Sequence, residues 1–151
     1  MKNNQAMEIA VITSRFNDDI TDKLKSGALK RLMECDVPEN QITLIDVPGA
    51  IEIPLIALQC AKQNKYHAII CLGAVIRGET SHYDYVCEQV SQGCQQVMMQ
   101  YDIPVIFGVL TTENEAQALD RAGGAHGHKG RDAADAAIEM IGLMQQFMKS
   151  A

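Results

Sequence analysis

The sequence lacks tryptophan, holds only 5% aromatic residues and contains no apolar run long enough to cross a bilayer. Its longest such run, Ala68 to Ile76, is far shorter than the roughly 18 residues of a membrane-spanning helix. The opening residues Lys2 to Gln5 also lack the apolar stretch of a signal peptide. We therefore expect a cytoplasmic protein that has no contact with a membrane.

Cysteine pairs are absent as well. The five cysteines are odd in number, include no C-x-x-C motif and fall mostly in apolar stretches, which predicts buried reduced thiols and no disulfide framework. His126 and His128 have a spacing found in metal sites, but they lack the partnered cysteine or acidic ligands of such sites. We expect a polar, glycine-rich loop there and no metal site.

Positive charge is scarce, because 13 Lys and Arg stand against 19 Asp and Glu. The net charge of −6 gives no field that attracts nucleic acid or anionic lipid, so an anionic ligand needs a local site. With 151 residues, of which 47% are hydrophobic, the chain can bury one core without disulfides or metals. We expect a single domain over residues 1–151, in which residues 1–7 are a loosely ordered N-terminal segment.

Four short apolar runs recur along the chain, with helical patterns between them. Their hydrophobicity is continuous rather than alternating, which is typical of parallel strands covered by helices on both faces. Right-handed connections between such strands predict a three-layer α/β sandwich with a four-stranded parallel sheet in flavodoxin-like order. The runs are Glu8 to Ser14, Gln41 to Val47, Ala68 to Ile76 and Val105 to Leu110.

Apolar residues between and after these runs recur at helical spacing and predict five helices. The first includes Ile20 to Leu32, and Pro54 marks the first turn of the second. The third covers about Ser81 to Met99, a short fourth ends near Arg121, and the last runs from about Gly130 to Lys149. Two helix starts have the spacing of a capping box, namely Ser81 with Asp84 and Thr112 with Glu115.

In an open parallel sheet, a ligand binds beyond the carboxyl ends of the strands, where the strand order switches. The segment Pro48 to Glu52 follows a strand there and offers free backbone groups and one carboxylate to a heterocycle edge, although an ordinary loop is the alternative. Phe16 and Phe107 also lie near strand ends. One ring could stack on a planar ligand and the other could wall it in, with core packing as the alternative, above all for Phe107.

A phosphate site is the second candidate. The segment Gly78 to His82 places a glycine, two hydroxyls and free N–H groups at a helix start, although ordinary helix capping needs the same residues. The helix dipole favours a neutral imidazole at His82, which can accept and return protons, with a surface histidine as the alternative. Arg121 could bind a phosphate bidentately or complement its own helix end, and Lys129 is a weaker candidate for the same task.

Together these segments resemble the 6,7-dimethyl-8-ribityllumazine synthase family of riboflavin biosynthesis, over nearly the whole chain. Several ordered motifs at matching spacing are far more specific than any one of them. The motifs are Ser14 to Asn17, Pro48 to Pro54, Leu72 to Tyr83, Pro104 to Thr111 and Arg121 to Gly124. The resemblance implies a transferase that needs no cofactor. It condenses 5-amino-6-(D-ribitylamino)uracil with 3,4-dihydroxy-2-butanone 4-phosphate and releases inorganic phosphate.

The resemblance also implies roles for particular residues. His82 corresponds to the proton-transfer histidine, and Glu79, Thr80 and Arg121 correspond to the group that binds the butanone phosphate. Phe107 corresponds to a residue supplied across a subunit boundary. Ile51 stands where the family often has an aromatic residue. The residues that correspond to the pyrimidine and ribityl site are Phe16, Ala50, Ile51, Glu52, Ala74, Val75, Ile76 and Phe107.

For the assembly, the resemblance implies a homopentamer. It leaves open a 60-subunit icosahedral shell and an association with riboflavin synthase. Two other classes of protein share a layered parallel sheet. An FMN-binding module should purify yellow. A phosphorelay receiver should have an aspartate after the third strand, where Arg77 and Gly78 stand. A third alternative is a lumazine-binding or shell protein that has lost turnover.

Overall fold

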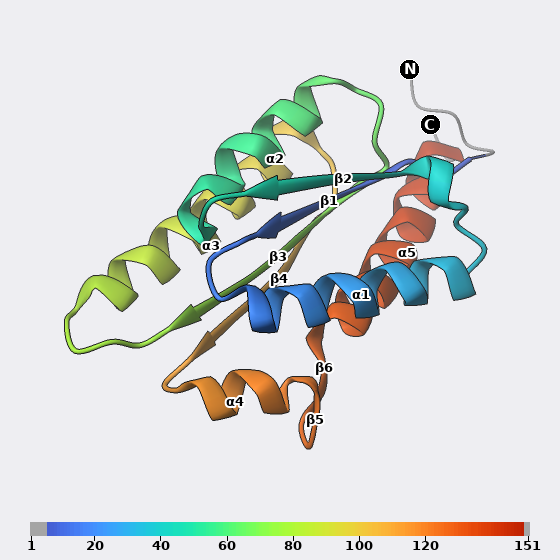
Figure 1. The fold of residues 1–151 in the computed structure, drawn as a ribbon. Helices are drawn as coiled ribbons and strands as arrows, with labels where there is room; N and C mark the ends of the chain where they lie inside the picture. The colour runs from blue at the N-terminus through green and yellow to red at the C-terminus, as the bar shows by residue number, and fades with distance from the viewer. Residues whose placement is uncertain (1–5, 150–151) are drawn as a thin grey trace.

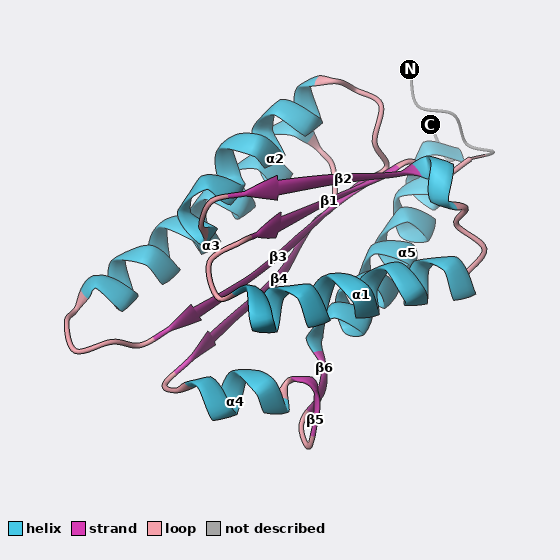
Figure 2. Ribbon diagram, viewed as in Figure 1, coloured by secondary structure: helices cyan, strands magenta, loops and turns pink. Residues whose placement is uncertain are grey.

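The computed structural model describes residues 6–149, which form a parallel sheet with helices on both faces (Figure 1; Figure 2). The sheet strands are β1 (Ile9–Ser14), β2 (Ile42–Val47), β3 (Ala68–Ile76) and β4 (Val105–Thr112). The longer helices are α1 (Asp18–Glu34), α2 (Ile53–Lys62), α3 (His82–Tyr101) and α5 (Lys129–Lys149). The shorter elements are η1 (Glu39–Gln41), η2 (Ala50–Glu52), α4 (Glu115–Asp120), β5 (Ala122–Gly124) and β6 (Gly127–His128).

The four long strands are parallel in the order β2-β1-β3-β4, which confirms the predicted three-layer sandwich with flavodoxin-like order. Helices α1 and α5 pack on one face of the sheet, and α2 and α3 pack on the other (Figure 1). Alternate residues of β1 enter the two layers: Val11 packs toward α1 and α5, and Ile12 toward α2 and α3. The chain leaves β1 for one face and β3 for the other, so the strand order switches between them. This switch point is where a crevice is expected.

Two strands differ from the prediction. Strand β2 is an edge strand, and Leu44 is 50% exposed, so the expectation that helices cover both of its faces is wrong. Strand β4 extends to Thr112 instead of ending at Leu110, because its last residues pair with Val75 and Ile76 of β3. The extension carries β4 to the same level as β3 at the carboxyl edge of the sheet.

Both predicted capping boxes are wrong. Ser81 is the N-cap of α3, but its side chain makes no capping hydrogen bond, since Thr80 Oγ1 accepts from the His82 N–H instead. Helix α4 begins after Asn114, whose Oδ1 accepts the N–H of Gln117. Thr112 belongs to β4 and donates its hydroxyl to the Asn114 carbonyl, so it cannot cap the helix.

The cysteines are free thiols, as predicted. Cys60, Cys71 and Cys94 are buried in the layer between the sheet and helices α2 and α3, and Cys35 and Cys87 are half-buried. The predicted loose segment over residues 1–7 lies mostly outside the described residues; within it, Met7 packs against the core. Over the described residues, no helix is both long enough and apolar enough to cross a membrane.

Candidate active site

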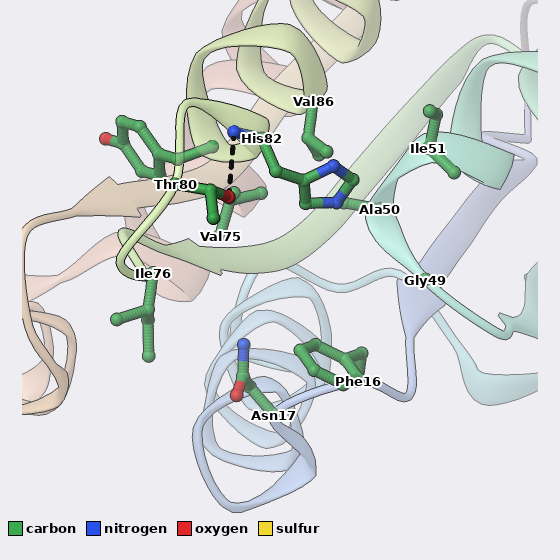
Figure 3. Close-up of a pocket in the computed structure, with 12 residues that line it drawn as sticks. Phe16, Asn17, Gly49, Ala50, Ile51, Val75, Ile76, Thr80, His82 and Val86 are labelled. Atoms are coloured by element: carbon green, nitrogen blue, oxygen red, sulfur yellow. Dashed lines mark hydrogen bonds between the residues drawn. The ribbon is translucent and has the colours of Figure 1, made fainter.

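A cavity of about 420 Å³ opens at the switch point between β1 and β3, and we call it the His82 cavity (Figure 3). Its walls are mainly apolar. In Figure 3 the imidazole of His82 and the ring of Phe16 lie on facing sides of the space, and Phe16 is 71% exposed. The lining residues are Phe16, Asn17, Gly49, Ala50, Ile51, Val75, Ile76, Gly78, Thr80, His82, Tyr83 and Val86.

The turn after β1 places Phe16 at this cavity. Asn17 adopts the left-handed conformation, with φ 65°, which asparagine tolerates better than most residues and which directs the chain into α1. The Asn17 side chain donates to the Ala74 carbonyl across 2.9 Å, and the Phe16 N–H donates to the Pro48 carbonyl across 3.1 Å. These bonds fix the aromatic residue between the ends of three strands.

The wall formed by η2 is braced by Glu52. Its Oε1 accepts the N–H of Gly49 across 2.8 Å, so the carboxylate closes the turn and does not line the cavity. Ala50 and Ile51 then present their side chains to the space, with Ile51 43% exposed (Figure 3). A branched aliphatic side chain therefore occupies the open rim of a mostly apolar wall.

The loop that carries Thr80 and His82 is held by Arg77, which directly follows β3. Arg77 Nη2 donates to Asp84 Oδ1 across 3.1 Å, and Nε lies 2.7 Å from Glu113 Oε2. The guanidinium also lies 4.4 Å from the centre of the Tyr83 ring, a cation–π contact. Burial raises the pKa of the Tyr83 phenol, so this wall residue stays neutral at physiological pH. Arg77 thus joins the start of α3 to the end of β4.

A second cavity, of about 320 Å³, lies beside the free edge of β4, and we call it the Arg121 cavity. Arg121 Nη1 donates to the Gln117 carbonyl across 2.9 Å, and the Lys129 N–H donates to the Arg121 carbonyl across 2.8 Å. Most side chains of this cavity are polar, and its two permanent cations, Arg121 and Lys129, outnumber its one carboxylate, Asp132, so that it suits a phosphate. The lining residues are Val109, Leu110, Thr111, Thr112, Arg121, His126, Lys129 and Asp132.

The structure divides the sequence-predicted residues. The His82 cavity brings together Phe16, Ala50, Ile51, Val75, Ile76, Thr80 and His82. Ala74 is buried beside it, and Glu79 is exposed in the loop above it. Arg121 lines the other cavity, and the two cavities share no lining residue. Phe107 lines neither cavity; it is half-buried against the α2 and α3 layer, opposite Cys71 in the strand register.

The sequence motifs include Asn17, Arg77 and Tyr83, but no role at the site was predicted for these three residues. Asn17 carried a usable signal, because an asparagine directly after a buried strand is a common left-handed turn residue. The position of Arg77 between Asp84 and Glu113 depends on the pairing of β3 with β4, which no local pattern shows.

Comparison with known proteins shows to which family a chain with this arrangement of residues belongs. The family model described as 6,7-dimethyl-8-ribityllumazine synthase matches residues 6–145. The chain belongs to this family. The 6,7-dimethyl-8-ribityllumazine synthase of Coxiella burnetii strain Dugway 5J108-111 is 57% identical over 142 residues, which cover 94% of each chain. Those of strains CbuG_Q212 and RSA 493 are 56% identical over the same share. The family expected from the motifs, and with it an enzyme of lumazine synthesis, is therefore confirmed.

Proposed function

We propose that the chain condenses 5-amino-6-(D-ribitylamino)uracil with 3,4-dihydroxy-2-butanone 4-phosphate to give 6,7-dimethyl-8-ribityllumazine, inorganic phosphate and water, the penultimate step of riboflavin biosynthesis. Support comes from the family match and from two cavities whose chemistries fit the two substrates. The His82 cavity suits a planar pyrimidine, which would stack on Phe16 against Ala50, Ile51, Val75 and Ile76. Glu52, whose carboxylate accepts the Gly49 N–H, and the buried Ala74 would support this wall rather than contact the ligand.

His82 is the residue we assign to proton transfer. Its ring faces the cavity, and the residue begins α3 (Figure 3). An imidazole can take the proton that the amine loses as it adds to the ketone and return it to the hydroxyl that leaves as water, which forms the imine. It can then take the C–H proton lost in the elimination and deliver it to the departing phosphate. Because amines and ketones condense readily once held together, the larger contribution comes from binding both substrates in one place.

The departing phosphate needs positive charge, and beyond the N-terminus of α3 the His82 cavity offers no permanently charged cation. Among the described residues that line it there is no Lys or Arg. Arg77 is already engaged by two carboxylates. Arg121 lies at the end of α4, on the α1 and α5 side of the sheet, whereas α3 lies on the other side (Figure 1). One set of predicted site residues is thus divided between two cavities, and this division is the main support for the proposal.

We therefore infer that each active site forms between two copies of the chain. One copy contributes His82, Thr80 and the Glu79 loop, and its neighbour contributes Arg121 and Phe107. Large apolar side chains at the surface give this assembly an interface, because Leu55, Tyr85 and Met99 are 61%, 64% and 72% exposed. Head-to-tail contacts form a closed ring when the rotation between neighbouring copies adds up to a full turn.

The ring that the resemblance supports is a homopentamer in the cytoplasm. Closure of twelve pentamers into a 60-subunit shell, and docking of riboflavin synthase, would both use surfaces beyond the shared site. Native mass spectrometry separates these states. A monomer under assay conditions would contradict the shared site.

The direct test of the activity mixes purified protein with both substrates and follows lumazine fluorescence together with phosphate release. We expect both signals to rise in step and to exceed the protein-free mixture. Phosphate release without fluorescence would contradict ring closure. Absence of both signals, in a protein that binds lumazine, would favour a shell or binding protein without turnover.

A subunit-mixing experiment tests the shared site. Phe16→Asp replaces the exposed aromatic ring of the His82 cavity with a charged side chain. Arg121→Ala removes the guanidinium from the Arg121 cavity. Each variant alone should therefore be nearly inactive. If one copy supplies each cavity, random mixed rings contain about a quarter of sites with both intact, and activity returns. Sites built within single chains would stay inactive in every mixture.

A further inference from the structure

His128 occupies a position that neither the motifs nor the proposed chemistry explains. The residue lies in β6, and its ring is inserted between α1 and the start of α5. Its Nδ1 accepts the N–H of Gly130 across 3.1 Å and the N–H of Arg131 across 3.3 Å. These are two of the amides that the first turn of α5 leaves unpaired, so His128 acts as the cap of that helix.

The surrounding chain is shaped to hold this ring. On α1, a Cβ at Gly27 would overlap the imidazole, and on α5 a Cβ at Gly130 would collide with the Leu24 carbonyl and crowd the ring. The Lys23 backbone lies beside the ring. Because Nδ1 accepts from two amides, the arrangement requires that this nitrogen carries no proton.

The same residue is attached to the cations of the Arg121 cavity. His128 pairs with Ala122 in the β5–β6 hairpin, and the Lys129 N–H donates to the Arg121 carbonyl. Arg121 and Lys129 therefore flank the two pairing residues on either side of the hairpin. The ring of His128 thus links this hairpin to both α1 and α5.

We propose that His128 is a positioning residue for the phosphate subsite: its unprotonated ring holds the β5–β6 hairpin so that Arg121 and Lys129 face a phosphate ester, and protonation loosens that grip. The inference rests on the proposed function, in which the Arg121 cavity takes the phosphate. It predicts that the affinity for the butanone phosphate depends on pH through His128, whereas the affinity for the aminouracil does not.

The charges around the ring oppose its protonation. Helix α1 brings Lys23, Lys30 and Asp22 to the space beside His128, and α5 brings Arg131 and Asp132. Burial, and then the charge of Arg131, lower the pKa of His128, with Asp132 acting in the opposite direction. An imidazolium would also direct an N–H at the two amides and at the positive end of α5. When the ring does gain a proton, both cap bonds are lost together.

The sign of the effect follows from the lowered pKa. At neutral and alkaline pH the ring is unprotonated and the cap is complete. As the pH falls below the ordinary histidine range, the cap is lost and the affinity for the phosphate substrate decreases. A phosphate ester itself gains a proton near pH 6, so the test requires a variant that caps without titrating.

His128→Asn is that variant, because an amide oxygen accepts N–H groups at a helix start and carries no proton equilibrium. KM for each substrate is measured from about pH 5.5 to 8 in wild type, His128→Asn and His128→Ala, with His67→Asn as the matched control. His67 also accepts a backbone N–H through Nδ1, that of Glu8 across 3.0 Å, but it lines neither the His82 cavity nor the Arg121 cavity. His67→Asn should keep the wild-type profile.

We expect wild-type KM for the butanone phosphate to rise more steeply toward acid pH than in His128→Asn. We expect His128→Ala to raise this KM about fivefold at neutral pH, from the loss of a cap, and to approach the wild-type value at acid pH, where the wild-type cap is lost too. KM for the aminouracil should stay constant in every variant. Identical pH profiles in wild type and His128→Asn would overturn the inference, as would an equal rise of both KM values in His128→Ala. A wild-type protein without turnover would instead refute the proposed function.

Discussion

The two cavities at the carboxyl edge of the sheet differ both in chemistry and in how the chain forms them. The His82 cavity lies between the central strands β1 and β3, where helices cover both faces, and its walls are mainly apolar. The Arg121 cavity lies beside the edge strand β4, where a short helix and a hairpin hold two cations. A central position therefore suits a flat heterocycle, and an edge position suits a solvated phosphate. Both cavities can serve one reaction if the Arg121 cavity of one copy of the chain lies against the His82 cavity of another copy.

Among the changes that test the roles of the two cavities, Arg121→Ala is expected to have the largest effect. The change removes a bidentate donor to the phosphate, and charged hydrogen bonds of this kind are worth about 1.5–3 kcal/mol each. We expect kcat/KM for the butanone phosphate to fall about hundredfold, with KM for the aminouracil unchanged. Steady-state kinetics with each substrate varied in turn provides the measurement.

Arg121→Lys is the matched variant, because it keeps the charge and loses the planar fork. It should recover part of the lost affinity. If Arg121→Ala and wild type bind the phosphate substrate equally well, the cation cavity is not part of the site.

A smaller loss is expected from His82→Ala. Since holding both substrates together contributes more than proton transfer, kcat should fall about tenfold, at or below the low end of general acid–base effects. Single-turnover fluorescence measures the step directly. A complete loss of turnover, with an unchanged fold by circular dichroism, would contradict this expectation. It would show that proton transfer by His82 contributes more to the rate than holding the two substrates together.

The fold and the His82 cavity were largely predictable for physical reasons. Buried parallel strands leave continuous apolar runs, and their carboxyl ends meet at one edge, so Phe16, Ile51 and His82 could be placed together. The exposed face of β2 could not be predicted, because its apolar residues are typical of a strand that helices cover on both faces.

The Arg121 cavity was predicted less well, since contacts distant in sequence create it. Arg121 and Lys129 were recognised as candidate cations, but their hairpin depends on Gly123 and Gly127, with φ 106° and 88°. The cap role of His128 depends on Gly27, about one hundred residues earlier in the chain, and no local pattern reports such a contact.

Arg77→Gln is expected to have a moderate effect, since the guanidinium positions the loop without lining the cavity. Loss of the bonds to Asp84 and Glu113 should let Thr80 and His82 move and should lower kcat about fivefold. KM for the aminouracil should change little, because Phe16 remains fixed. Stopped-flow kinetics measures both values.

Arg31→Gln is the control for this change, because Arg31 also bridges two carboxylates, Glu34 and Asp135, at a surface away from both cavities. Its kinetics should match wild type. If both variants lose activity alike, the loss at Arg77 reflects general stability rather than the position of the loop.

The smallest effect, and the only gain, is expected at Ile51. This side chain is 43% exposed at the rim of the His82 cavity, so a larger ring can replace it without disturbing the core. In Ile51→Phe, a second aromatic surface near Phe16 should tighten binding of the lumazine product about threefold, since aromatic pairs add about 0.5–1.5 kcal/mol beyond area burial. Fluorescence titration with the lumazine product measures the affinity, and Ile51→Leu controls for volume without a ring. Equal affinities in the two variants would mean that the wall contributes packing alone, and that Phe16 provides the stacking by itself.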